Sequence, residues 1–116
     1  MDISHRRLGN ILLVKLNGEL DLVTAPVFRE IVDGQLENFE RLTHLILDLA
    51  KVDFIDSSGL GAILGRYKRI AQRGGQLLLT NGKPQVLKII ELSGMGKILP
   101  HYQNTQQALA RIRGEE

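Results

Sequence analysis

Short apolar runs alternate with segments of helical periodicity along this chain, and that alternation constrains the fold more than any other feature. The run H-L-I-L-D-L at 44–49 is apolar and too short for a helix, which predicts a strand. In the segment that follows, apolar side chains recur at the spacing of one helix face: Leu60, Ile63, Leu64, Tyr67, Ile70 and Ala71. Strands that alternate with helices form parallel sheets, because each helix returns the chain to the edge where the previous strand began. The alternation predicts an α/β fold.

The N-terminal part has two strand patterns and one helix pattern. An apolar strand is predicted over 10–20, and residues 2–8 can pair with it through a turn at 9–10. Thr24 is a suitable N-cap, and Pro26 suits a first helical turn. Apolar side chains then recur at helical spacing: Val27, Phe28, Ile31, Val32, Leu36 and Phe39. We therefore expect a strand pair followed by a helix.

The C-terminal part continues the alternation. A buried strand is predicted over 76–80, a helix over 84–93 and a short strand at 98–99. Asn104 or Thr105 is expected to cap a last helix. The whole pattern predicts a mixed, mostly parallel β-sheet of about four or five strands, covered by about four helices.

Composition is that of one ordinary globular domain. The chain has 116 residues, which suits a single domain over 1–116, with 113–116 expected to form a frayed tail. It has no cysteine, which excludes a disulfide framework, a thiolate metal site and a cysteine nucleophile. Its net charge of +2 is spread over both signs without a block of either, so composition gives no support to nucleic-acid binding.

Targeting signals are not expected. Arg6 and Arg7 precede an apolar run at 11–14, which has a faint similarity to a twin-arginine signal, but Lys15 ends the run and no small-residue cleavage site follows. No apolar stretch approaches the roughly 20 residues of a membrane span. We therefore expect a cytoplasmic protein without membrane contact.

Signatures of common enzyme sites are not matched. Gly59, Gly61 and Gly65 resemble a dinucleotide fingerprint, but the third glycine comes one residue late and the helix has already begun. Gly96 and Lys97 lack the first glycine and the following hydroxyl of a phosphate-binding loop. No G-x-S-x-G motif is present, so the serines at 57–58 are not in a nucleophile elbow. We expect no enzymatic activity and no cofactor.

Metal-binding patterns are weak. The histidines are scattered without ligand spacing: His5, His44 and His101. Asp48, Asp53 and Asp56 alternate around the end of a predicted strand, which leaves a Mg²⁺ site as an alternative.

The junction Asp56-Ser57-Ser58-Gly59 carries more polar groups than a helix start requires. Aspartate and serine are both good N-caps, and one cap stabilises a helix by about 1 kcal/mol. A second polar side chain there can face solvent at the carboxyl edge of the sheet, where open α/β sheets place their ligand sites. The helix N-terminus also favours anions, so a phosphorylated serine would find backbone donors in place. The residues alone are compatible with a cap, with a phosphoserine switch, or with both.

Two other functions remain open from the residues. A sensor for a small ligand or nucleotide could use the same helix N-terminus. A hydrolase could use Ser57 or Ser58, although a nucleophilic serine needs an adjacent base and no histidine occupies an obvious base position.

The stretch D-S-S-G-L-G-A-I-L-G-R-Y-K at 56–68 resembles the anti-anti-sigma factors, also called anti-sigma factor antagonists, which are single STAS domains of the SpoIIAA type. The segments N-G-E-L-D at 17–21 and L-S-G-M-G-K-I at 92–98 are also similar to that family. The resemblance covers nearly the whole chain, with the segments in the same order and at the same spacing.

The resemblance implies a regulatory binding protein that is a substrate and not a catalyst. Ser57 corresponds to the family's phosphorylation site, and Asp56 and Ser58 flank it. In the family, the unphosphorylated protein binds an anti-sigma factor that is also an ATP-dependent serine kinase, and a sporulation sigma factor is released. Phosphorylation by that kinase inactivates the antagonist, and a serine phosphatase restores it.

A docking face for the partner is expected at the start of this helix and on two neighbouring segments. Its predicted members are Glu19, Asp21, Asp56, Ser57, Ser58, Gly59, Leu60, Ser93, Gly94 and Met95. Met95 could instead fill a gap in the core, and Asp21 could be only a turn residue. Core packing is expected of Leu64, Tyr67 and Ile70.

Overall fold

A five-stranded sheet runs through the middle of the molecule, with the strands in the spatial order β1-β2-β3-β4-β5. The computed structural model describes residues 1–115. β1 (Asp2–Leu8) pairs antiparallel with β2 (Ile11–Leu20), and the remaining pairs are parallel. The other strands are β3 (His44–Ile55), β4 (Leu77–Thr80) and β5 (His101–Tyr102). The predicted mixed, mostly parallel sheet is confirmed.

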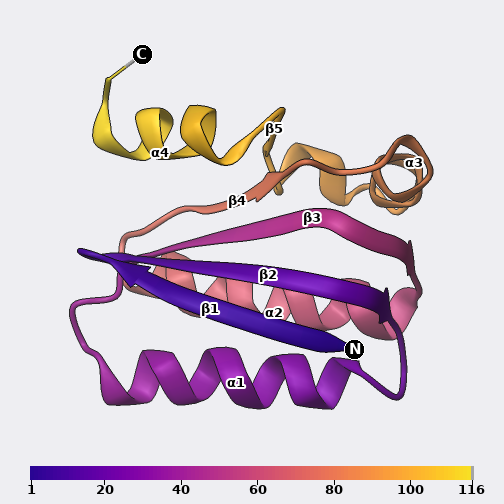
Figure 1. Cartoon of the computed structure of the whole chain (residues 1–116), viewed down its shortest axis with the longest axis horizontal. Helices are drawn as coiled ribbons and strands as arrows, with labels where there is room; N and C mark the ends of the chain where they lie inside the picture. The colour runs from indigo at the N-terminus through magenta and orange to yellow at the C-terminus, as the bar shows by residue number, and fades with distance from the viewer. Residues whose placement is uncertain (116) are drawn as a thin grey trace.

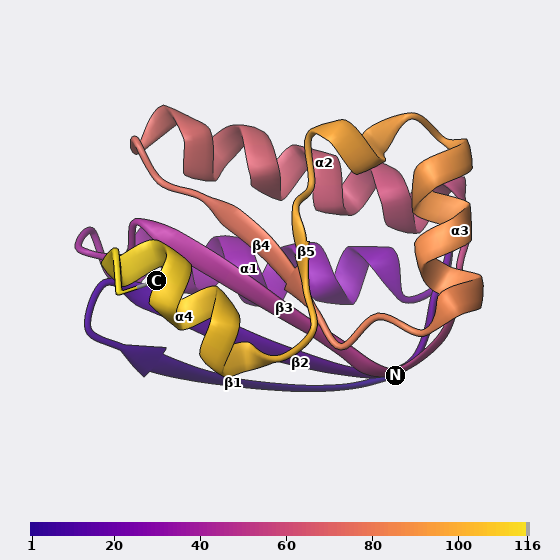
Figure 2. The same ribbon diagram turned by 90° about the horizontal axis from the view of Figure 1, so that it is seen from above.

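Helices cover both faces of this sheet (Figures 1 and 2). They are α1 (Ala25–Asn38), α2 (Ser57–Gln72), α3 (Pro84–Leu92) and α4 (Thr105–Arg113), with a short 3₁₀ helix, η1 (Met95–Lys97), after α3. Buried side chains of α1, α2 and α3 share one core with the sheet, whereas α4 packs on the opposite face. The predicted α/β class with four helices is confirmed.

The alternation of side chains along β2 and β3 explains the two cores. On one face, side chains of these strands join the large core under α1, α2 and α3: Leu12, Val14, Leu16, Leu45, Leu47 and Leu49. The intervening residues Ile11, Leu13 and Ile46 point to the other face. There they form a smaller core with Leu78 of β4 and Ala108 of α4. Because successive side chains of a strand face opposite ways, a sheet covered on both faces reads as a continuous apolar run.

The α1 segment departs from expectation at its start and at two apolar positions. Thr24 is at the N-cap position, but its side chain makes no capping hydrogen bond to the helix. Its hydroxyl instead donates to the carbonyl of Glu19 at 2.7 Å, inside the preceding turn. Val27 and Phe39, predicted on the apolar face, are 46% and 36% exposed. Val27 lies to one side of the buried stripe formed by Phe28, Val32 and Leu36. Phe39 follows the last residue of α1 as its C-cap, where the backbone is already extended.

The prediction of a strand at 98–99 is wrong. The backbone amides of Ile98 and Leu99 both donate to the carbonyl of Met95, at 3.0 and 2.9 Å, so this pair completes a helical turn. Leu99 is 2% exposed and belongs to the main core. Two consecutive apolar residues fit a strand or a buried turn equally well, and the strand forms just after them, at β5.

The C-terminus agrees with prediction only in part. Asn104 caps α4, since its side-chain oxygen accepts from the amide of Gln107 at 2.9 Å. Of the predicted frayed tail 113–116, Arg113 still belongs to α4, Gly114 ends that helix with φ +70°, and residue 116 lies outside the described residues. Within residues 1–115, no helix has the length and apolar character that crossing a membrane requires.

Candidate functional site

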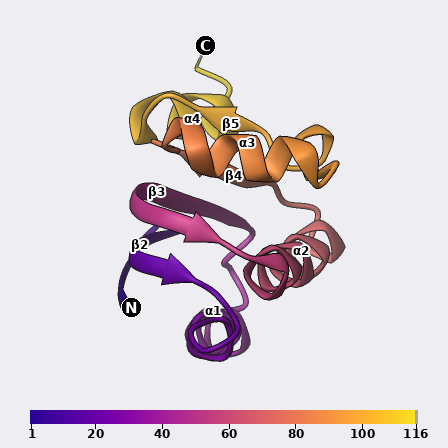
Figure 3. The ribbon, with the colours of Figure 1, turned by 90° about the vertical axis from the view of Figure 1, so that its right-hand side faces the viewer.

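The predicted junction lies where β3 ends and α2 begins, at one end of the molecule. Figure 3 looks at that end and shows α1 and α2 starting there, while α3 runs across it. β2 ends at Leu20, beside Ile55 at the end of β3. The two parallel strands therefore bring the β2–α1 turn and the β3–α2 junction together, as expected for the carboxyl edge of a parallel sheet.

Asp56 is the residue that joins these two segments. It is the N-cap of α2, and its Oδ1 accepts a hydrogen bond from the backbone amide of Gly59 at 2.9 Å. Its other oxygen, Oδ2, accepts from the backbone amide of Leu22 in the β2–α1 turn at 3.1 Å. In addition, the Asp56 amide donates to the carbonyl of Leu20 at 3.2 Å. Asp56 therefore accounts for the capping function and also fixes the neighbouring turn.

Capping by Asp56 leaves the two serine side chains available. Ser57 is exposed and Ser58 is half-buried. Within residues 1–115, neither hydroxyl has a hydrogen-bond partner, which distinguishes them from Asp56. The first amides of α2 have no carbonyl of the same helix to bind, so the Ser57 hydroxyl lies at a positively polarised helix end. The junction thus presents a hydroxyl that the fold itself does not use.

Gly59 and Leu60 lie beneath this surface. A Cβ at Gly59 would be 2.3 Å from the carbonyl oxygen of Leu20 and 3.0 Å from Cγ2 of Ile55, so only glycine allows α2 to approach the strand ends this closely. Leu60 is 7% exposed and packs in the main core. Both residues position the helix start, and the exposed surface belongs to their neighbours.

The β2–α1 turn is held by Asp21. Its Oδ1 accepts from the backbone amides of Val23 at 3.0 Å and Thr24 at 3.1 Å. The amide of Thr24 is also the main cause that holds the pKa of the Asp21 carboxyl below its ordinary value. Glu19, the other predicted member from this segment, is exposed at the end of β2.

The third predicted segment is the turn between α3 and η1, which lies at the same end of the molecule as the start of α2 (Figures 2 and 3). Ser93 and Gly94 are exposed, and Gly94 has φ +83°, a conformation that favours glycine. The Ser93 hydroxyl donates to the carbonyl of Ile90 at 2.6 Å. Met95 is half-buried and packs against the main core, in line with the alternative that it fills a gap there.

The aspartates of the possible Mg²⁺ site have separate partners. Asp48 accepts from the amide of Ala50 at 3.0 Å and from the side-chain amide of Asn81 at 3.2 Å. Asp53 forms an ion pair with Lys83, while Asp56 caps α2. Among residues 1–115, no three acidic or histidine side chains are grouped as metal ligands would be.

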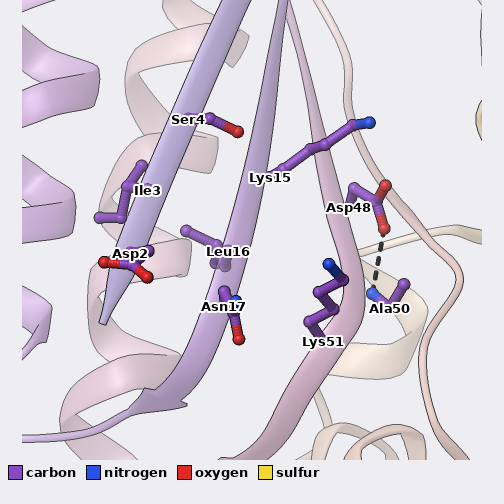
Figure 4. Close-up of a pocket in the computed structure, with 9 residues that line it drawn as sticks. All are labelled: Asp2, Ile3, Ser4, Lys15, Leu16, Asn17, Asp48, Ala50 and Lys51. Carbon is purple, nitrogen blue, oxygen red and sulfur yellow. Dashed lines mark hydrogen bonds between the residues drawn. The ribbon is translucent and has the colours of Figure 1, made fainter.

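A hollow of about 280 Å³ lies away from the junction. Figure 4 shows its lining, which comes from β1, β2 and β3 and carries charges of both signs: Asp2, Ile3, Ser4, Lys15, Leu16, Asn17, Asp48, Ala50 and Lys51. None of these residues belongs to the junction, so this hollow gives no support to a ligand site at Ser57.

Comparison with known proteins decides the family. The STAS domain profile matches residues 2–108. This chain belongs to the STAS domain family.

The most informative relatives of this STAS domain are bacterial regulators. An anti-sigma F factor antagonist from Paenibacillus polymyxa is 38% identical over 112 residues, which cover 97% of this chain and 93% of that protein. The unphosphorylated form of the anti-sigma factor antagonist SpoIIAA superposes with a TM-score of 0.85 at 26% identity, covering 97% of both chains. The phosphorylated form of SpoIIAA from Bacillus superposes with a TM-score of 0.75 at 25% identity, covering 97% of this chain and 100% of the other.

Sequence reasoning missed two side chains of this STAS domain at the junction. Leu22 and Val23 are 71% and 78% exposed in the turn that Asp21 and Asp56 hold. The available signal was their position: two apolar residues follow a turn-forming aspartate and precede Pro26, outside any strand or helix pattern.

Proposed function

We propose that this STAS domain is an anti-sigma factor antagonist, which acts by binding an anti-sigma factor. The observation that carries the proposal is the exposed, unbonded hydroxyl of Ser57 at the start of α2, in a chain whose relatives bear that function in their names. The protein is a ligand and a substrate, and it needs no catalytic group or cofactor of its own.

We further propose that Ser57 is phosphorylated by the anti-sigma factor itself, acting as an ATP-dependent serine kinase. A kinase needs a hydroxyl that is exposed and rigidly presented, because catalysis of phosphoryl transfer is mostly positioning. Asp56 supplies the rigidity by capping α2 and by holding the β2–α1 turn, and it leaves the Ser57 hydroxyl free. The two solved forms of SpoIIAA, unphosphorylated and phosphorylated, support this assignment by similarity.

Phosphorylation would end binding without unfolding the domain. It adds about −1.5 to −2 charge at pH 7, and a helix N-terminus tolerates that charge well. In the complex, the hydroxyl must face the γ-phosphate of ATP. The phosphoserine would then lie against the phosphates of the remaining ADP, so like charge and bulk would both oppose rebinding. A serine phosphatase would restore the binding form.

The proposed docking face is the exposed part of the predicted set. Glu19, Ser57, Ser93 and Gly94 are exposed, and Asp21, Asp56, Ser58 and Met95 are half-buried around them. Gly59 and Leu60 support this face from below. The regulated protein is proposed to be a sporulation sigma factor in the cytoplasm, by similarity to the anti-sigma F factor antagonist.

Incubation with the cognate anti-sigma factor kinase and ATP, followed by intact-mass measurement, tests the proposal. We expect the wild-type chain to gain one phosphate, Ser58→Ala to gain it as well, and Ser57→Ala to gain none. Ser57→Ala should still bind the kinase, and Ser57→Asp should bind at least about tenfold more weakly. A phosphate on Ser57→Ala, or tight binding of the phosphorylated wild-type chain, would contradict the proposed switch.

A further inference from the structure

The β2–α1 turn exposes two aliphatic side chains beside the Ser57 junction. Leu22 is 71% exposed and Val23 is 78% exposed, while Val27 in the first turn of α1 is 46% exposed. The large and small cores are built without Leu22 and Val23. Apolar side chains stabilise a fold through the area that they bury away from water, and these two bury little. Their exposure therefore does not contribute to the stability of the domain.

Side-chain hydrogen bonds hold the backbone under these side chains. Asp21 binds the amides of Val23 and Thr24, and Asp56 binds the amide of Leu22. The hydroxyl of Thr24 also accepts from the amide of Asp21 at 2.9 Å. Ordering of a binding loop normally opposes association, and a turn that is ordered in advance avoids much of that cost. The turn is therefore built to present two aliphatic side chains in one fixed arrangement.

The charges around the turn favour a particular partner. Carboxylates lie near it at the ends of β2 and β3. Asp21 and Asp56 bind the amides of the turn, Glu19 is at the end of β2, and Asp53 is two residues before the end of β3. Among residues 1–115, the only basic side chain within ion-pair distance of any of them is Lys83, on Asp53. The N-terminal ammonium also helps to lower the pKa of Asp21. It and Lys83 offset two of these four carboxylates, so the rim stays net acidic in a chain that carries +2 overall. An apolar centre with an acidic rim complements an apolar pocket with a basic rim.

We propose that Leu22 and Val23 are the anchor side chains with which this STAS domain binds its anti-sigma factor, by inserting into an apolar pocket rimmed with lysine or arginine. This inference rests on the proposed function for the identity of the partner. In this proposal the β2–α1 turn provides most of the binding affinity, and phosphorylation of Ser57 ends the binding. Anionic membranes and a second copy in the same orientation are disfavoured, because both would oppose the acidic rim.

The test compares kinase binding by the double variant Leu22→Ser/Val23→Ser with binding by the wild-type chain. Both positions are exposed, so the variant should fold as the wild type does, which circular dichroism checks. We expect its affinity to fall by at least about tenfold, since anchor residues carry most of the energy of an interface. Phe39→Ser is the control, because Phe39 is partly exposed at the far end of α1. This variant removes the ring that the Arg7 guanidinium covers at 3.5 Å, so circular dichroism checks its fold as well, and its affinity should not change.

Kinetics of Ser57 phosphorylation give a second readout. The anchors touch the partner away from the hydroxyl, so the double variant should raise KM about tenfold and leave kcat nearly unchanged. Added salt should weaken wild-type binding by slowing association. An unchanged affinity and KM in the double variant would overturn the inference while leaving the proposed function in place. Failure of the wild-type chain to bind or be phosphorylated would instead refute the proposed function.

Two further outcomes would also overturn the inference. Wild-type self-association that the double variant abolishes, seen by sedimentation without any effect on kinase binding, would assign the turn to a second copy. Wild-type binding to vesicles of anionic phospholipid, lost in the double variant, would assign it to a membrane surface.

Discussion

The carboxylate of Asp56 accepts a hydrogen bond from the backbone amide of Leu22, 34 residues earlier in the chain, at 3.1 Å. The same carboxylate caps α2 through the amide of Gly59. One side chain therefore sets both the helix that presents Ser57 and the turn that presents Leu22 and Val23. Loss of that carboxylate should disturb both, whereas loss of the Ser57 hydroxyl should disturb neither.

Replacement of Asp56 by alanine should lower the free energy of unfolding by about 1–3 kcal/mol, because a cap and a second hydrogen bond are lost. Asp56→Asn should lose less, since its amide oxygen can still accept one of the two bonds. Urea denaturation measures the loss, and faster hydrogen exchange of the Leu22 amide reports the freed turn. Ser57→Ala is the matched control and should stay within about 0.5 kcal/mol of the wild type. Equal stabilities of Asp56→Ala and Ser57→Ala would contradict the bridging role.

Two glycines of α2 should respond to alanine in opposite directions. Gly59→Ala places a Cβ 2.3 Å from the Leu20 carbonyl oxygen and should destabilise the domain by about 1–3 kcal/mol. Gly61→Ala meets nothing within 4 Å and should stabilise the helix by up to about 1 kcal/mol. Thermal unfolding of the two variants distinguishes the close approach from simple helix propensity. A stabilised Gly59→Ala would show that α2 does not need glycine against the strand ends.

Arg73 should stabilise the domain by joining the C-terminal end of α2 to the C-terminal end of α1. Its guanidinium donates to the carbonyls of Leu42 at 2.8 Å, Phe39 at 3.3 Å and Leu36, all at or just beyond the end of α1. Arg73→Met keeps the aliphatic stem, loses these bonds, and should cost about 1.5–3 kcal/mol of unfolding free energy in urea. Lys68→Met, at an exposed position of α2, the helix that Arg73 follows, should have little effect. Comparable losses in the two variants would point to net charge instead.

Stability should fall as the pH drops below the ordinary histidine pKa of 6.5. Burial lowers the pKa of His44 and of His101. In its neutral form, each imidazole accepts a hydrogen bond from a backbone amide. Nδ1 of His44 accepts from Gln76 at 3.0 Å, and Nε2 of His101 accepts from Gly82 at 2.9 Å. The unfolded chain therefore takes up protons at a higher pH than the folded one, so the contribution is complete above pH 6.5 and is lost below it.

Urea midpoints at about pH 7.5 and about pH 5.5, on either side of that value, measure this dependence. The double variant His44→Gln/His101→Gln should lose less stability over the same interval than the wild-type chain does. Parallel losses in both proteins would assign the pH dependence to other groups.

Much of the fold could be predicted from the sequence, because its strongest signals are local. The apolar run at 44–49 and the helical spacing after Leu60 each depend on one element and its period. Predictions failed where local chemistry allowed two answers. Ile98 and Leu99 suit a strand or a buried turn, and only the packing of Leu99 into the main core selects the turn.

For the candidate site, the sequence by itself determined the chemistry: a strand-to-helix junction with aspartate, two serines and glycine, and a hydroxyl in excess of what capping needs. Only the tertiary structure decided which side chain does what. Asp56 caps α2, Gly59 allows the helix to pack closely against Leu20, and Ser57 remains exposed. The role of Leu22 was beyond the sequence, because its partner Asp56 is distant along the chain and becomes a neighbour only when β2 and β3 pair in parallel.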